Sequence, residues 1–150
     1  MSDFRVDKVE VPARLHLADG SIAGGILYLA PMSPGRLGAQ TVEDLMEEPG
    51  RVLPFRHADG RFVLVGKASV AAVALPASLG RPPGFWSPVP VRVMLTGRHE
   101  VGGALLLEEG AGKRLSDALN APQSWIPLEN EADLIWLAKG HIVTLEAKGA

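Results

Sequence analysis

Residues 11–29 read VPARLHLADGSIAGGILYL, and residues 89–107 read VPVRVMLTGRHEVGGALLL. At a constant offset of 78 residues, eight of these 19 positions are identical, and the same register continues to Arg36 and Arg114. Self-similarity at a fixed spacing is typical of a structural unit that is used more than once. The sequence therefore predicts a tandem duplication whose unit is about 60 residues long.

The repeated stretch predicts a hairpin. Polar and apolar residues alternate over 14–17, and the Asp19-Gly20 pair that follows favours the positive φ angles of a tight turn. A second strand is expected over 22–29, and it contains the paired glycines 24–25. Glycines inside a strand mark a bulge, a bend or the close approach of another backbone segment.

Each unit is expected to continue with a short helix and three more strands. Thr41 and Asp44 fit a capping box, which predicts a helix start there, and residues 115–120 are its counterpart. The further strands are expected over 52–53, 61–66 and 69–75, and over 125–126, 134–138 and 141–147. The fourth strands (FVLV and LIWL) lack polar alternation, so both faces of each are expected to be covered.

The chain is expected to divide into a first repeat over 1–75, a Pro-rich linker over 76–88 and a second repeat over 89–150. The two repeats are expected to pack as a pseudo-twofold pair, because units this small bury little area alone. Phe85 and Trp86, at the end of the linker, are expected to pin it onto a barrel. The alternative is an exposed docking pair.

The composition excludes several classes of protein. The 150 residues contain no cysteine, which excludes disulfides, thiol nucleophiles and thiolate metal sites. The net charge is −2, so there is no bulk attraction to nucleic acid or anionic lipid. The charged N-terminal stretch lacks a signal-peptide pattern, and no apolar run is long enough to span a membrane. A cytoplasmic protein without a membrane partner is expected.

Two stretches resemble the motifs of the Sm-like barrels. Residues 15–26 (LHLADGSIAGGI) resemble the first motif, and residues 135–145 (IWLAKGHIVTL), in which two strands flank a basic tight turn, resemble the second. Residues 114–120 (RLSDALN) are similar to an element of uncharacterised bacterial small-barrel proteins. The resemblance implies a mainly β fold of two tandem Sm-like or SH3-like five-stranded barrels, each with one short helix.

The loop after the second strand departs from that family. Sm proteins that bind RNA carry Asp and Asn residues there, which form a base pocket. This chain has Ala-Pro-Met-Ser at 30–33 and Glu-Glu-Gly at 108–110. The resemblance is therefore carried over for the fold and not for RNA binding.

No motif predicts a catalytic or metal site. The chain has four histidines, His16, His57, His99 and His141. None has a histidine at the matching position of the other repeat, and their spacing is not that of metal ligands. They are therefore expected to be solvated loop side chains. Asp44 and Asp117, one in each repeat, are expected to complement a helix N-terminus. No cofactor is expected.

Six residues are candidates for contact with a partner or ligand. They are Arg36, Lys67, Phe85, Trp86, Arg114 and Lys139. The lysines occupy the turn where Sm barrels place a basic ligand-contacting side chain. Arg36 and Arg114 match between the repeats, although a local ion pair of Arg114 with Asp117 is the alternative reading.

The expected function is a non-catalytic protein-interaction or scaffold module that binds another protein or associates with itself. This reading predicts an exposed apolar patch or an open strand edge. One alternative is an RNA or nucleotide binder, which predicts that the two lysines and two arginines converge on one face. The other is a small-molecule enzyme that pairs His57 or His141 with an acid.

Overall fold

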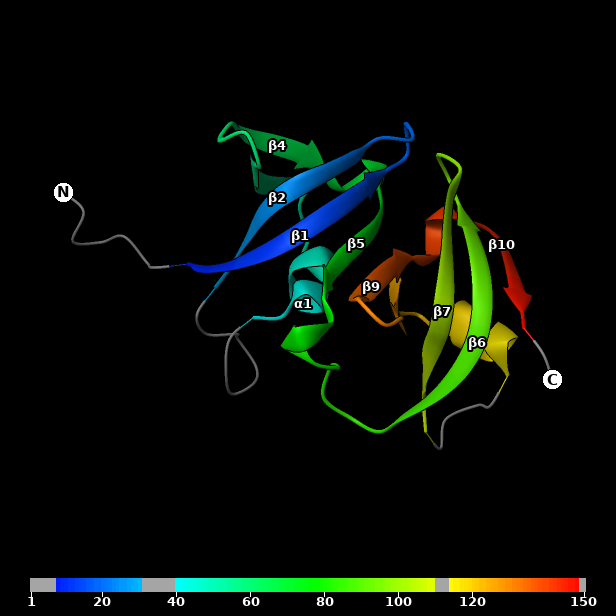
Figure 1. The fold of residues 1–150 in the computed structure, drawn as a ribbon. Helices are drawn as coiled ribbons and strands as arrows, with labels where there is room; N and C mark the ends of the chain where they lie inside the picture. The colour runs from blue at the N-terminus through cyan, green and yellow to red at the C-terminus, as the bar shows by residue number, and fades with distance from the viewer. Residues whose placement is uncertain (1–7, 31–39, 110–113, 149–150) are drawn as a thin grey trace.

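A computed structural model of the chain describes residues 8–30, 40–109 and 114–148. They form a mainly β fold, with ten antiparallel strands in one open sheet and two short α-helices (Figure 1). The strands are β1 (Val9–Leu17), β2 (Ile22–Leu29), β3 (Val52–His57), β4 (Phe62–Gly66), β5 (Val70–Pro76), β6 (Trp86–Leu95), β7 (His99–Glu108), β8 (Trp125–Glu129), β9 (Asp133–Ala138) and β10 (Ile142–Ala147). The helices are α1 (Val42–Glu47) and α2 (Leu115–Asn120). The 3-10 turns are η2 (Lys67–Ser69), η3 (Ala77–Leu79) and η4 (Lys139–His141).

The order of strands in the sheet is β10-β6-β7-β8-β9-β5-β1-β2-β3-β4. The first five strands of the chain and the last five therefore form two groups with the same order. Within each group the fifth strand comes first in the sheet and is followed by the first, second, third and fourth strands. Antiparallel pairing of β5 with β9 joins the two groups. The expected pseudo-twofold pair is wrong, because a twofold axis would bring like strands together, whereas here a fifth strand pairs with a fourth.

Local sequence signals account for the turns and helices. The turn after β1 is the expected one, with Gly20 at a φ of +95° and the Asp19 carboxylate accepting a hydrogen bond from the Ser21 backbone N–H. The capping box is also confirmed: Thr41 Oγ1 accepts from the Asp44 N–H, and the Asp44 carboxylate accepts from the Thr41 N–H.

The second glycine of each repeated pair lies where another backbone segment crosses it. A Cβ atom on Gly25 would stand 2.0 Å from the Arg56 carbonyl oxygen, and one on Gly103 would stand 2.4 Å from the Glu129 carbonyl oxygen. A Cβ on Gly24, by contrast, would meet nothing within 4 Å. Of the three alternatives expected for these glycines, the close approach of another backbone segment holds at Gly25 and Gly103, where only glycine fits.

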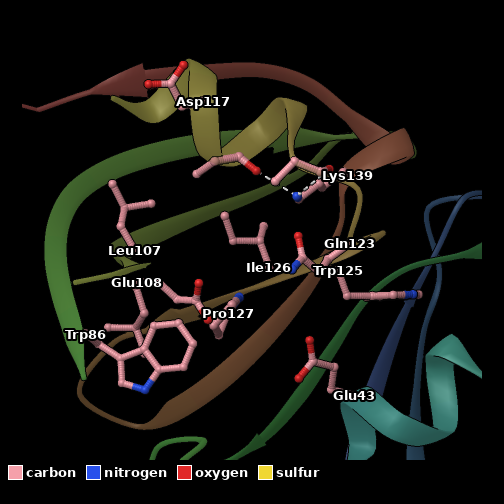
Figure 2. A pocket seen from close by; sticks show the side chains of 13 residues that line it. Glu43, Trp86, Leu107, Glu108, Asp117, Gln123, Trp125, Ile126, Pro127 and Lys139 are labelled. Carbon is pink, nitrogen blue, oxygen red and sulfur yellow. Dashed lines mark hydrogen bonds between the residues drawn. The ribbon is translucent and has the colours of Figure 1, made fainter. Parts of the chain in front are cut away.

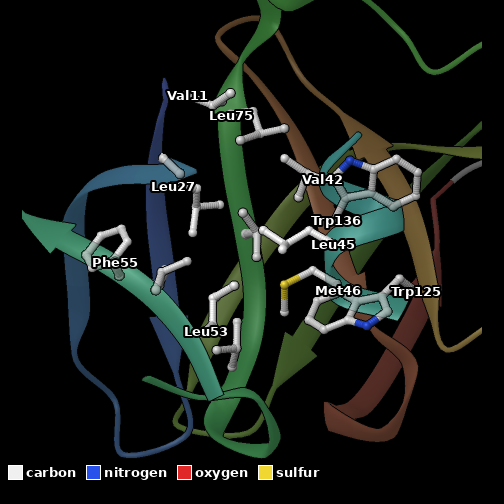
Figure 3. Close-up of a cluster of buried hydrophobic side chains, with 14 of the residues drawn as sticks. Val11, Leu27, Val42, Leu45, Met46, Leu53, Phe55, Leu75, Trp125 and Trp136 are labelled. Carbon is white, nitrogen blue, oxygen red and sulfur yellow. The ribbon is translucent and has the colours of Figure 1, made fainter. Parts of the chain in front are cut away.

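Two apolar cores lie on opposite faces of the β5–β9 junction. The first contains side chains of β1–β5 and α1, and it also takes in Trp125, Trp136 and Ala138 from the second group of strands (Figure 3). The second contains side chains of β6–β9, and it also takes in Ala71, Ala72 and Ala74 from β5. Each group therefore completes the core of the other.

Candidate interaction surface

The fourth strand of the second group, β9, is covered on both faces. On one face Trp136 is 3% exposed, and on the other face Leu137 is 0% exposed. Figure 3 shows Trp136 and Trp125 packed beside the helix α1, whose apolar side chains Leu45 and Met46 belong to the same core. The expectation that both faces of this strand are covered is confirmed.

The fourth strand of the first group, β4, is open on its outward face. Leu64 lies opposite Pro54 in β3, as Trp136 lies opposite Pro127 in β8, yet Leu64 is 62% exposed. Phe62 is 61% exposed. The same expectation is therefore wrong for β4 in a single chain, because this face is open to solvent. Among the described residues, no strand pairs with the far edge of β4 either. Together with Val52 of β3, these side chains form an exposed apolar patch, here called the β4 patch.

The backbone of β4 offers unpaired hydrogen-bonding groups beside this patch. His57 N–H donates to the Arg61 carbonyl, and Lys67 N–H donates to the Arg51 carbonyl. Because hydrogen-bonded pairs alternate with non-bonded pairs in an antiparallel ladder, the Pro54–Leu64 pair is a non-bonded one. The N–H and C=O groups of Leu64 therefore point away from β3 and toward the free edge.

The strand β10 is the other end of the sheet, and it also has one neighbour within the described part of the chain. Lys148 N–H donates to the Pro90 carbonyl of β6, so the alternation directs the backbone groups of Leu145 and Ala147 toward the free edge. Val143 on this strand is an exposed apolar side chain. In Figure 1, β4 and β10 lie on opposite sides of the molecule.

The two candidate lysines are held by the helices. Lys67 Nζ donates to the carbonyls of Leu45 and Glu48 at the end of α1, at 3.0 and 2.9 Å. Lys139 Nζ donates to the carbonyls of Ala118 and Ala121 at the end of α2, at 2.6 and 3.2 Å. A cation at a helix C-terminus satisfies carbonyls that have no partner within the helix. This shared structural task explains why a lysine follows the fourth strand in both groups.

The other candidates that the structure describes differ in their exposure to solvent. Arg36 lies outside the described residues, and Arg114 is an exposed residue at the N-cap of α2. Phe85 is 83% exposed, so the expectation that it pins the linker onto a barrel is wrong, because its ring faces solvent. Trp86 is half-buried in β6, and its indole N–H donates to the Pro82 carbonyl at 2.9 Å.

A cavity of about 230 Å³ lies between α2 and the strands β7 and β8 (Figure 2). It brings together two candidates, Trp86 and Lys139. Burial lowers the pKa of Lys139, and its ammonium already faces the helix carbonyls. The other charged side chains that line the cavity are acidic: Glu43, Glu108 and Asp117. Such a lining repels phosphate, which disfavours a nucleotide at this place.

The histidines do not assemble a reaction centre in the described segments. His57 Nδ1 stands 3.8 Å from the Asp59 carboxylate, beyond hydrogen-bond reach. His141 Nε2 is bonded to the Ala68 carbonyl at 2.7 Å, and His99 Nε2 to the Leu17 carbonyl at 2.7 Å. The expectation of a solvated loop side chain is wrong for His99, which is buried, and for His16, which lies in β1 with both ring nitrogens buried. No group of three or more His, Asp or Glu side chains that could hold a metal occurs within residues 8–30, 40–109 and 114–148.

Sequence reasoning expected an exposed apolar patch or an open strand edge but did not place it at β4, and it missed the contacts that join the two groups. The run FVLV in β4 was itself a signal, because an apolar strand without alternation needs a cover on each side.

No protein-family model matches this chain, and no curated protein or solved structure matches it significantly. Within the described residues, no helix has both the length and the apolar character that crossing a membrane requires.

Proposed function

We propose that this protein is a non-catalytic protein-interaction or scaffold module, built from two tandem small-barrel units related by duplication. The strand order common to β1–β5 and β6–β10 supports the duplication. The observation that carries the function is the β4 edge, where an apolar patch lies beside outward-facing backbone groups.

An edge of this kind binds an extended protein segment. Backbone hydrogen bonds supply affinity in strand addition, and alternate side chains of the added strand select the partner. Native proteins protect free edges with charge, proline or a bulge. The β4 sequence Phe62–Gly66 carries none of these, which supports its use as a binding edge.

Site-specific photo-cross-linking tests this function in the cells that make the protein. A photoreactive phenylalanine analogue in place of Leu64 is expected to cross-link to protein, and the same analogue at Leu79, an exposed leucine in η3, is expected not to. The product at position 64 is expected to disappear when Phe62→Pro closes the edge. Cross-links to nucleic acid alone, or no cross-links at position 64, would contradict the proposal.

A further inference from the structure

We propose that the β4 edge of one chain pairs with the β10 edge of a second copy, in the way that β9 pairs with β5 inside the chain, so that copies join head to tail. This inference rests on the proposed function and names the partner at the β4 edge. The internal junction supports it, because there the fourth strand of one group pairs with the fifth strand of the other.

The internal junction defines a register that transfers to the free edges. Trp136 of β9 lies opposite Val73 of β5. Leu64 is the position in β4 that corresponds to Trp136, since each lies opposite a proline of the preceding strand. Leu145 is the position in β10 that corresponds to Val73 in β5. Leu145 lies opposite Val93 of β6, and Val73 lies opposite Leu15, the matching position of β1. The transferred register places Leu64 opposite Leu145, and both direct their backbone groups to the free edge.

The proposed contact would cover two apolar surfaces, the β4 patch and the apolar side chains of α2. Both are open to solvent in a single chain, wholly or in part. Trp136 packs with Val42, Leu45 and Met46 of α1, which are all buried. The corresponding side chains of α2 are Leu115, Ala118 and Leu119. They pack against the second core but are only partly buried. In the proposed contact the β4 patch of one copy covers α2 of the next, as Trp125 and Trp136 cover α1.

The charges at the two edges form one opposite-sign contact and one like-sign contact. At the internal junction Arg14 of β1 reaches across β5 to the Asp133 carboxylate of β9, at 2.6 Å. At the free edges the acidic residue is on the other strand: Glu146 of β10 lies opposite Arg92 of β6. The transferred register puts Glu146 opposite Val63 and diagonal to Arg61, within reach of a cross-strand ion pair. The same register sets Lys148 directly opposite Arg61, a like-charge pair that the contact of Glu146 with Arg61 has to offset.

The placement of the two edges decides the kind of assembly. They lie on opposite sides of the molecule and differ from each other (Figure 1). A contact between unlike surfaces is heterologous, so it leaves a free edge at each end of a dimer and extends to a closed ring or a filament. An isologous dimer would instead pair β4 with β4 or β10 with β10.

Two edge variants and their mixture test this inference by light scattering on the purified full-length chain. Leu64→Pro removes an outward N–H from β4, and Ala147→Pro removes one from β10, while each leaves the inward hydrogen bonds of its strand in place. The wild type is expected to show a mass of several chains that falls on dilution. Each variant alone is expected to associate about a hundredfold more weakly and to remain at the 15.9 kDa of one chain.

An equimolar mixture of the two variants is the decisive sample. It is expected to give a complex of twice the 15.9 kDa chain mass and no larger species, because one intact β10 edge then meets one intact β4 edge. Leu64→Lys, which keeps the backbone N–H, serves as a second β4 variant, and Leu79→Lys is the matched control that retains the wild-type mass. Circular dichroism verifies that each variant is folded.

Each other result overturns the inference. A wild type that stays a single chain at all concentrations rules out the contact, and a dimer formed by either proline variant alone shows an isologous contact instead. These outcomes leave the proposed function intact if position 64 still cross-links to a different protein. Conversely, loss of all protein cross-links at that position removes the proposed function together with the inference.

Discussion

The strands β9 and β4 hold corresponding places in the two halves of the sheet, and one is buried while the other is open. Both are apolar runs that face a proline of the preceding strand. Trp136 of β9 is covered because β5 and α1 lie beside it, whereas Leu64 of β4 has no such neighbours among the described residues. The comparison shows that the apolar sequence of a strand indicates that other elements must pack against its faces. The arrangement of the two groups decides whether those elements come from the same chain.

The largest expected effect comes from truncating the side chain at the two corresponding positions. Trp136→Ala is expected to lower the free energy of unfolding by about 3–5 kcal/mol, because it empties a packed site at the junction. Leu64→Ala is expected to change it by less than about 0.5 kcal/mol in a dilute single chain, because the side chain is already in solvent. Urea unfolding at low concentration measures both. Equal losses of unfolding free energy in the two variants would contradict the claim that Trp136 is packed while Leu64 is exposed.

The paired glycines give a second contrast, this time within each half. Gly25→Ala and Gly103→Ala are each expected to destabilise the fold by about 1–3 kcal/mol, because the new Cβ would collide with a crossing backbone carbonyl. Gly24→Ala is the matched control, since its Cβ would stand in open space and a change below about 0.5 kcal/mol is expected. Thermal unfolding monitored by circular dichroism gives these values. If the neighbouring alanines behaved alike, the close approach would not be what selects glycine.

The two lysines are expected to respond alike, in contrast to β4 and β9. Lys67→Met and Lys139→Met each remove a cation from a helix C-terminus, and each is expected to cost about 1 kcal/mol of unfolding free energy. Chemical denaturation of the two variants tests this. A loss of ligand or partner binding without any loss of stability would show that the lysines serve as contacts instead.

The smallest expected effect is a pH dependence that comes from His16 of the first half. Both ring nitrogens of His16 are buried without a hydrogen-bond partner among the described residues, and burial, followed by the nearby His99 and Arg14, lowers its pKa from 6.5, with Asp133 opposing them. The folded chain therefore binds fewer protons than the unfolded chain, so stability is full above about pH 6.5 and falls as the pH drops from there toward the native pKa.

His16→Met tests this pH dependence, because methionine is the residue that the second repeat carries at the matching position, Met94. The substitution is expected to flatten the plot of unfolding free energy against pH below about pH 6.5, while Arg92→Met, in the second half, leaves the slope in place. An unchanged slope in His16→Met would assign the pH dependence to other groups.

Much of the fold was predictable because it depends on short-range signals. Alternation and Asp19-Gly20 predicted the first hairpin, and the second strand expected over 22–29 matches β2, Ile22–Leu29. The capping box at Thr41 predicted the start of α1. These features depend on residues that are neighbours in the sequence, where propensity and turn chemistry act directly.

The pairing of β5 with β9 was not predictable from those signals. It joins residues about 60 positions apart, such as Val73 and Trp136, and depends on which strand edges remain free once each half has formed. The roles of the two lysines and of the buried His99 were missed for the same reason, since their partners are carbonyls that only the tertiary structure brings near.

Hydrogen exchange at two amides tests the central claim most directly. In dilute protein the Trp136 N–H, bound within the β5–β9 junction, is expected to be protected, and the Leu64 N–H is expected to exchange quickly. On concentration, Leu64 is expected to become protected as the second copy pairs with β4, while Trp136 stays unchanged. An amide of Leu64 that exchanges quickly at every concentration would contradict the claim that β4 is bound as β9 is.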